Sequence, residues 1–311
     1  MVAGDDMATV MHIHNGDVVA TAAKRSGVSG DHFVYRESLI TGPVVPGDEW
    51  IETRARALTE GFGSDLLRVR TELLEQEQAL DRAREREEIV LWFEHDLYCL
   101  VHLVQLLDRL RGAPLSLVWS PRPLGDCDED ELREAYESRE PVSPSMQSTA
   151  NEVWRDYIAA DAASLNRWLE QRTDGFPFLR DGLALHAARF PSFRLGLGRV
   201  EEILLRLIAG GRSAFAAIFD GFIAEEPRFG FGDSEIARLL SAMASSPVPL
   251  LVSSGDERSA SFAITPAGDD VLSGEADNVE INPPDHWLGG VHLKKGNLWR
   301  FDGTKLIRSA V

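Results

Sequence analysis

Cysteine is scarce in this sequence of 311 residues, which contains only Cys99 and Cys127. Neither lies in the spacing of a zinc site, and two cysteines do not make the disulfide framework of a small secreted protein. Long apolar runs are also missing, since no segment approaches the roughly 18 apolar residues of a membrane span. The first residues lack the basic and apolar regions of a signal peptide. We therefore expect a cytoplasmic protein that makes no contact with membranes.

Positive charge is the second shortage. Lysine and arginine together number 32 against 50 aspartates and glutamates, which gives a formal net charge of -18 at pH 7. Such acidity repels phosphate backbones and leaves little counterion release to drive nucleic-acid binding. We expect no binding to duplex DNA, whereas a small-molecule ligand or a protein partner is compatible with this charge.

The first 125 residues alternate between short apolar segments and helix-like segments. Strands are predicted over 9–14, 31–39, 89–93 and 115–119, and helices over 18–27, 50–88 and 96–112. This alternation is typical of a parallel sheet with helical crossovers. The fold class predicted for residues 1–125 is therefore α/β.

The chain changes character after residue 125. Residues 126–195 read as a helical region with several proline and glycine breaks. Residues 196–275 combine helices with a late hairpin, VPLLVSS and SFAITPAGDDVL around a GDER turn, and resemble a winged helix. Residues 276–311 form a tail with two short strands around a KKGN turn. The C-terminal part is thus predicted to be mainly helical with a winged-helix-like hairpin.

In open parallel sheets, ligands bind at the carboxyl ends of the strands. In the first domain, polar residues follow the apolar strands at these ends. If the strands at 9–14 and 89–93 are neighbours, the residues after them face one crevice. The predicted catalytic residues are Asp17, Glu94, His95 and Asp96. The predicted binding residues are His12, His14, Asn15, Gly16, Arg36 and His292.

These residue types suit acid–base chemistry, because a histidine flanked by carboxylates can act as a general base. His14 with Asp17, Glu94 and Asp96 is an alternative metal set, but its spacing is a weak signal and no metal is predicted. Neither a dinucleotide fingerprint nor a P-loop follows a strand, and the sequence leaves the cofactor unknown.

Structural roles compete with these functional ones. Aspartate is among the best helix caps, so Asp96 and Asp17 can each serve only to begin a helix. His95 can be a core histidine whose hydrogen bonds are satisfied. For each residue alone the structural role is the simpler interpretation, and the functional hypothesis depends on their joint position at strand ends.

Four segments carry a family resemblance: HIHNGDVVA, RESLITGPVVP, LWFEHDLYCLVHLVQLLDRL and the tail DHWLGGVHL with LWRFD. In this order, from residue 11 to about 303, they resemble the bacterial DUF1835 domain-containing proteins. The resemblance implies a bacterial cytosolic protein with this domain order, and the family has no established activity. The matching positions are His12, Gly16, Asp17, Gly42, Pro43, Trp92, Glu94, Asp96 and His292. Val18 stands where the family commonly has Ser, and Cys99 and Leu100 stand where it has Asp-Gln.

Two functions remain open. The first is a small-molecule enzyme, a hydrolase or transferase, with its site at the carboxyl ends of the N-terminal strands. The second is a non-enzymatic regulator that senses a ligand or binds a protein through the winged-helix-like module. Residues 206–240 contain four arginines and five acidic side chains, whereas a helix that reads DNA is distinctly basic.

Overall fold

The computed structural model describes residues 9–171, 173, 175–255 and 260–309. The chain divides into two compact units. Unit 1 comprises residues 1–39 and 47–155, and unit 2 comprises residues 40–46 and 156–311. Residues 126–155 therefore belong with the α/β unit, beyond the change in sequence character at residue 125. Each unit is described by itself.

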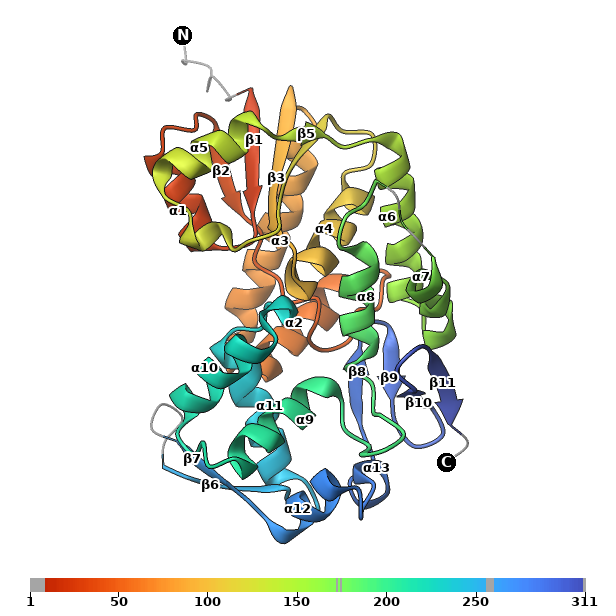
Figure 1. Ribbon diagram of the computed structural model, residues 1–311. Helices are drawn as coiled ribbons and strands as arrows, with labels where there is room; N and C mark the ends of the chain where they lie inside the picture. Colours follow the sequence, from red (N-terminus) through yellow and green to blue (C-terminus); the bar gives the residue numbers. More distant parts are fainter. Residues whose placement is uncertain (1–8, 172, 174, 256–259, 310–311) are drawn as a thin grey trace. The chain divides into compact units, whose positions relative to one another are not determined.

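Unit 1 is built on a five-stranded sheet with the order β2-β1-β3-β4-β5 (Figure 1). The strands are β1 (Val10–His14), β2 (Asp31–Val34), β3 (Glu88–Glu94), β4 (Leu115–Ser120) and β5 (Glu140–Pro141). The first four are parallel and β5 is antiparallel to β4. This confirms the predicted α/β class, and the first and third strands are neighbours, which is the condition set above for a shared crevice.

Five helices and one short 3-10 turn connect these strands in the described part of unit 1, and a sixth helix follows β5. They are α1 (Asp17–Arg25), α2 (Trp50–Phe62), α3 (Leu66–Ala83), α4 (Leu97–Arg109), η1 (Leu124–Asp126), α5 (Glu129–Glu137) and α6 (Pro144–Tyr157). The helix predicted over 50–88 is two helices, because Gly63 ends α2 in the left-handed region at φ 66° and Asp65 caps α3. The strand predicted over 31–39 ends at Val34.

The strand sequences explain how the sheet is covered. Side chains alternate along each strand, so His12 and His14 share one face of β1 and Met11 and Ile13 the other. On the histidine face, Trp92 packs in a core cluster with Ala23 of α1 and Leu132 of α5. Arg109 of α4 binds Glu77 and Asp81 of α3, so these two helices lie together. Right-handed crossovers that run in opposite directions from β1 and β3 require α1 and α4 on opposite faces.

Unit 2 is mainly helical. After η2 (Ala162–Leu165) its helices are α7 (Asn166–Glu170), α8 (Leu179–Ala187), α9 (Arg199–Ala209), α10 (Phe215–Glu225), η3 (Pro227–Phe229), α11 (Asp233–Ser245), α12 (Pro266–Ser273) and α13 (Asn278–Ile281). An antiparallel hairpin joins β6 (Leu251–Ser254) to β7 (Ser261–Ile264). The predicted hairpin is present, although the helix α12 replaces the second half of its second segment. Most of the predicted GDER turn, residues 256–258, lies outside the described residues.

Up to residue 309, where the description ends, the tail contains four short strands rather than the two predicted. They are β8 (His286–Leu288), β9 (Val291–Leu293), β10 (Leu298–Phe301) and β11 (Leu306–Ser309). The KKGN turn connects β9 to β10 through a bridge between Lys294 and Asn297, but each of these strands pairs mainly with another one. The Gly289–Gly290 turn between β8 and β9 was missed because the periodicity of such short strands is weak.

Across the described residues, none of the helices combines the length and the apolar character that crossing a membrane requires.

Candidate functional site

The loops that follow β1 and β3 lie side by side at the carboxyl edge of the sheet. His14, the last residue of β1, is in register with Trp92 of β3, two residues before Glu94. The chain leaves β1 through α1 toward β2 and leaves β3 through α4 toward β4. Strand order therefore reverses between β1 and β3, which is where open α/β sheets bind ligands.

Three chemically active side chains converge after β3. Glu94, Asp96 and Cys99 each offer a ligand atom, and these atoms all lie within 4.8 Å of one another. Asp96 is the N-cap of α4, and its Oδ1 accepts a hydrogen bond from the Cys99 backbone N–H at 2.7 Å. Glu94 Oε1 accepts one from the Leu124 backbone N–H at 2.9 Å. The capping role anticipated for Asp96 is thus confirmed, and it places the carboxylate beside two further polar groups.

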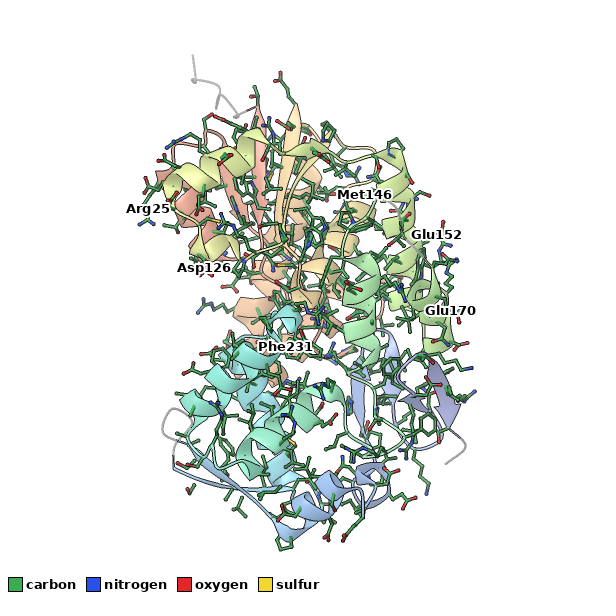
Figure 2. All side chains as sticks on the ribbon, viewed as in Figure 1. Arg25, Asp126, Met146, Glu152, Glu170 and Phe231 are labelled. Carbon is green, nitrogen blue, oxygen red and sulfur yellow. The ribbon has the colours of Figure 1, made fainter. Side chains whose placement is uncertain are left out.

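Burial and mutual repulsion raise the pKa values of this cluster. Burial raises the pKa of Asp96 to about 7, and the nearby Glu94 carboxylate adds to the effect. Burial likewise raises the pKa of Glu94, and Asp126 of η1, labelled in Figure 2, contributes in the same direction. Burial, then the neighbouring carboxylates, raise the pKa of the Cys99 thiol well above its usual range. The thiol is therefore protonated at neutral pH while Asp96 can exchange a proton.

Asn15 connects the loop after β1 to this cluster. Its Nδ2 donates a hydrogen bond to Cys99 Sγ at 3.1 Å. Its Oδ1 is buried and has no partner among the described residues. A buried amide oxygen without a donor is costly unless something else supplies one. The predicted residues Asn15, Glu94 and Asp96 are therefore brought together, with Cys99 as an additional member.

Gly16 and Asp17 follow Asn15 at the start of α1. Gly16 is the N-cap, so α1 begins without the Asp17 cap considered above. Gly16 has an extended backbone, and a Cβ placed on it would meet no atom within 4 Å. The fold itself therefore does not require glycine there. Asp17 instead accepts a hydrogen bond from Arg36 Nη2 at 2.5 Å, and both side chains are exposed. This ion pair joins the ends of β1 and β2, and among the described residues no hydrogen bond or ion pair joins Asp17 to Glu94.

His95 lies between the two carboxylates in sequence, but its ring packs against Trp119 of β4 with centroids 4.6 Å apart. Its backbone N–H donates to Ser120 O at 2.8 Å. Burial lowers the pKa of His95, so the ring is neutral at physiological pH.

His12 and His14 are fully buried in the sheet face beneath α1 and α5. His12 Nδ1 accepts from Trp92 Nε1 at 3.2 Å, so its Nε2 carries the proton and donates to Ser29 O at 3.1 Å. Burial lowers the pKa of His12 to about 4 and that of His14 to about 2. The hydrogen bonds with Trp92 and Ser29 satisfy both ring nitrogens of His12, so the ring needs no ligand.

A chain of hydrogen bonds fixes the tautomer of His14 as well. His32 Nε2 lies 3.1 Å from Val28 O and must donate to it, which leaves His32 Nδ1 as an acceptor. His14 Nε2 lies 2.9 Å from that atom and therefore donates to it. The remaining His14 Nδ1 is buried and has no partner among the described residues. His14 is thus a neutral core histidine whose one free lone pair lies at the end of β1.

The segment after β2 holds a buried polar network that the sequence did not reveal. Arg54 of α2 binds Glu37 through Nη2 at 2.5 Å and Nε at 3.2 Å, and both side chains are almost fully buried. Arg54 Nη2 also donates to Ser38 O, and Tyr98 of α4 donates to Glu37 O at 2.6 Å. This network fixes the end of β2 against α2 and α4. The only sign of this network in the sequence is the run of polar residues RES at 36–38.

A metal is a possible occupant of the cluster by donor type. Among the described residues the group that could hold one is Glu94, Asp96 and Cys99, without the His14 and Asp17 of the alternative set. The thiol proton would have to leave first, and the raised pKa of Cys99 opposes that. The donor set therefore fits proton transfer better than it fits a resident cation.

His292 belongs to unit 2, where its Nε2 lies 2.6 Å from Asp285 Oδ1 and its ring stacks on Trp287 at 4.4 Å. Unit 2 also contains buried cations that sequence reasoning missed. Arg189 Nη1 and Arg238 Nε are buried and unpaired among the described residues. Burial lowers the pKa of both, and mutual repulsion adds to the shift at Arg189. Arginines separated by 49 positions give no local signal that could have predicted this.

No family model matches the chain, and a search of curated proteins finds no relative.

Proposed function

We propose that the protein is a small-molecule enzyme, a hydrolase or a transferase, in which Asp96 and Glu94 carry out proton transfer. The observation that carries this proposal is the cluster of Glu94, Asp96 and Cys99 within 4.8 Å, at the point where strand order reverses. A carboxyl group with a pKa of about 7 is present in both protonation states at neutral pH. It can therefore act as a general acid in one step and a general base in the next.

The neighbouring groups support this role in distinct ways. Asn15 offers an amide oxygen that lacks a donor, so it can accept a hydrogen bond from a substrate N–H or O–H. Gly16 leaves open space beside the backbone at the start of α1, where a ligand can approach closely. Hydrolysis and group transfer both need a base that activates a nucleophile and an acid that protonates a leaving group. One pair of coupled carboxyl groups can supply both the base and the acid.

The proposal is tested by turnover. The full-length protein and its Asp96→Asn variant are each incubated with a bacterial metabolite extract, and with panels of esters, amides, phosphate esters and glycosides. Mass spectrometry then compares which compounds disappear. Asn keeps the cap on α4 but cannot exchange a proton, so a compound consumed by the wild type should persist with the variant. Asp65→Asn is the matched control, because Asp65 caps α3 in the same way and lies outside the cluster.

Three results would count against this proposal. Equal turnover by the wild type and Asp96→Asn would remove Asp96 from the chemistry. Turnover that appears only with added Mn²⁺ or Zn²⁺ would assign the carboxylates to metal binding. A compound that binds both proteins without being converted would favour the ligand-sensing regulator.

A regulator remains the second candidate because of the element order in unit 2. We propose that α9, α10, α11 and the β6–β7 hairpin form a winged-helix-like module. Ala214, between α9 and α10, forms an antiparallel bridge with Ser261 of β7, which supplies a third short strand. A winged helix has this succession of helix, short strand, two helices and hairpin.

The charge of α11 favours a protein partner for this module rather than DNA. Its first turn contains Asp233 and Glu235, and Arg238 is largely buried. We propose that the module does not bind duplex DNA. Fluorescence anisotropy with labelled random duplexes at physiological salt should show no binding, whereas tight, salt-sensitive binding would contradict the proposal.

We also propose that the chain is a member of the DUF1835 domain-containing proteins. The support is the order of the four sequence segments and the position of Asn15, Glu94 and Asp96 around one edge of the sheet. The family places Asp-Gln where this chain has Cys99 and Leu100. Cys99→Asp in this chain therefore tests whether a third carboxylate is compatible with the same turnover.

A further inference from the structure

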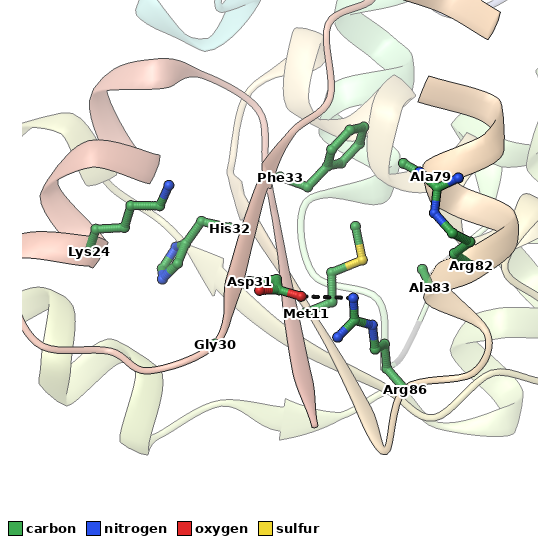
Figure 3. Close-up of a pocket in the computed structure, with 10 residues that line it drawn as sticks. All are labelled: Met11, Lys24, Gly30, Asp31, His32, Phe33, Ala79, Arg82, Ala83 and Arg86. Atoms are coloured by element: carbon green, nitrogen blue, oxygen red, sulfur yellow. Dashed lines mark ion pairs between the residues drawn. The ribbon is translucent and has the colours of Figure 1, made fainter. Parts of the chain in front are cut away.

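A hollow of about 390 Å³ lies beside β2, the edge strand of the sheet in unit 1. Its lining includes consecutive residues of the chain from Gly30 to Phe33. Figure 3 shows Lys24 and His32 on one side of β2, and Arg82, Ala83 and Arg86 of the α3 segment on the other. The hollow therefore follows the exposed edge of the strand, near its amino end. It is distinct from the cluster at the carboxyl ends of β1 and β3.

The backbone of β2 has hydrogen-bonding groups that face this edge. Tyr35 N–H donates to His14 O of β1 at 2.9 Å. Within a strand the backbone groups of alternate residues point to the same side, so those of Phe33 and Asp31 also point to β1. The N–H and C=O groups of His32 and Val34 point away from the sheet. No backbone hydrogen bond joins them to another strand within the described residues.

The rim of this hollow is basic in a protein whose net charge is -18. Arg86 pairs with Asp31 at 2.7 Å. Lys24 and Arg82 are exposed and form no ion pair with any described residue. They stand on opposite sides of β2, so one small anion cannot engage both. Successive side chains of an extended strand do point to opposite sides. Acidic residues on both faces of an added strand would therefore meet both cations.

The side of the hollow toward α3 also offers apolar surface. Met11, Phe33, Ala79 and Ala83 line it, and the two alanines leave room that a larger side chain would fill. Edge strands that accept another strand gain affinity from main-chain hydrogen bonds and specificity from such side-chain pockets.

We propose that the groove along β2 binds an acidic peptide segment of a partner protein, which adds to the sheet as an extended strand. The outward groups of His32 and Val34 supply the main-chain hydrogen bonds. Lys24 and Arg82 select acidic side chains, and the surface around Met11 and Phe33 receives an apolar one. The site is independent of the proposed enzymatic activity.

The probe for this site is a short fluorescein-labelled peptide in which pairs of glutamates alternate with pairs of valines. Its binding to the full-length protein is measured by anisotropy. A peptide with lysine in place of glutamate and a peptide N-methylated on its backbone are the matched controls. The acidic peptide should bind, and both controls should bind at least about tenfold more weakly, which corresponds to the loss of roughly 1.4 kcal/mol.

Variants of the protein locate the site. Arg82→Glu and Lys24→Glu should each weaken the binding of the acidic peptide by about tenfold. Lys295→Glu in unit 2 makes the same charge change elsewhere and should leave binding unchanged. Lys24 and Arg82 lie in the last turns of α1 and α3, where a cation also favours the helix dipole, so each melting curve is recorded. Hydrogen exchange with the peptide bound should protect the amides of His32 and Val34.

Several results would overturn the proposal. These are equal binding of the N-methylated peptide, exchange protection elsewhere but not in β2, and an effect of Lys295→Glu as large as that of Arg82→Glu. Absence of binding by the acidic peptide, together with protection of β2 by inorganic phosphate or citrate, would assign the hollow to a small anion instead.

Discussion

Asn15 Nδ2 donates a hydrogen bond to Cys99 Sγ at 3.1 Å, across 84 positions of the sequence. This bond joins the loop after β1 to the first turn of α4, which Asp96 caps. Two loops that diverge to opposite faces of the sheet are thereby held together at its edge. The same thiol lies beside both carboxylates of the cluster. The candidate site is therefore a connected set of side chains rather than two separate loop ends.

Replacing Gly16 by alanine separates ligand binding from folding. The backbone of Gly16 is extended and an added Cβ meets no atom within 4 Å, so Gly16→Ala should cost at most about 1 kcal/mol of stability, from the weaker cap. If substrates approach the backbone there, turnover should fall markedly. The measurement pairs thermal melting with the turnover assay. A variant with full activity would show that no ligand approaches this position.

Replacing Asp96 by asparagine should change how stability depends on pH. Between about pH 3.8 and 7, the Asp96 carboxyl group keeps its proton in the folded state but has lost it in the unfolded chain. The contribution of Asp96 to stability is therefore complete below pH 3.8 and is lost as the pH rises to about 7. Asn is an equally good cap and does not titrate. Relative to the wild type, Asp96→Asn should gain stability with rising pH, by up to about 1.4 kcal/mol for each pH unit of this window.

Denaturant titrations over this pH range measure the difference. A constant difference between the two proteins would mean that Asp96 titrates alike in the folded and unfolded states.

The buried histidines should make the protein sensitive to acid. His12 and His14 have folded pKa values of about 4 and about 2, against 6.5 in an unfolded chain. Between these limits the unfolded state binds more protons, so their contribution is complete above pH 6.5 and declines as the pH falls. We expect the free energy of unfolding to fall by about 1.4 kcal/mol per pH unit for each histidine between pH 6.5 and 4.

Tryptophan fluorescence can follow this unfolding, because Trp92 packs against both rings. His14→Phe removes one titrating group and should reduce the slope by the share of one histidine. An unchanged slope would place the acid sensitivity in other groups.

The ion pair of Glu37 with Arg54 should be strongly coupled. Both side chains are almost fully buried, so removing one leaves an uncompensated charge in the core. Glu37→Gln and Arg54→Met should each destabilise the protein by about 3–5 kcal/mol, and the double variant by clearly less than their sum. A double-mutant cycle by chemical denaturation measures this. Additive losses would show that the two charges are screened from each other.

The sequence predicted the α/β class, because apolar strands that alternate with amphipathic helices leave few other topologies, but it left the adjacency of β1 and β3 as a condition. It placed Glu94 and Asp96 at the end of β3 for the same reason. It could not predict the role of Cys99, since a cysteine on a buried helix face reads as a core residue. The partners of Glu37 and Arg54 were equally hidden, because a charged residue shows no sign in sequence that it will be buried. The break at Gly63 was missed within a long, strongly charged helical pattern.

The proposed acid–base chemistry requires that the Asp96 carboxyl group holds a proton up to neutral pH. An NMR titration of protein labelled with ¹³C at aspartate carboxyl groups measures this directly, with Asp96→Asn to assign the resonance. We predict that the Asp96 signal titrates near pH 7, and that Glu94→Gln lowers this midpoint because a repelling charge is removed. An Asp96 signal that titrates near the ordinary value of 3.8 would contradict this prediction.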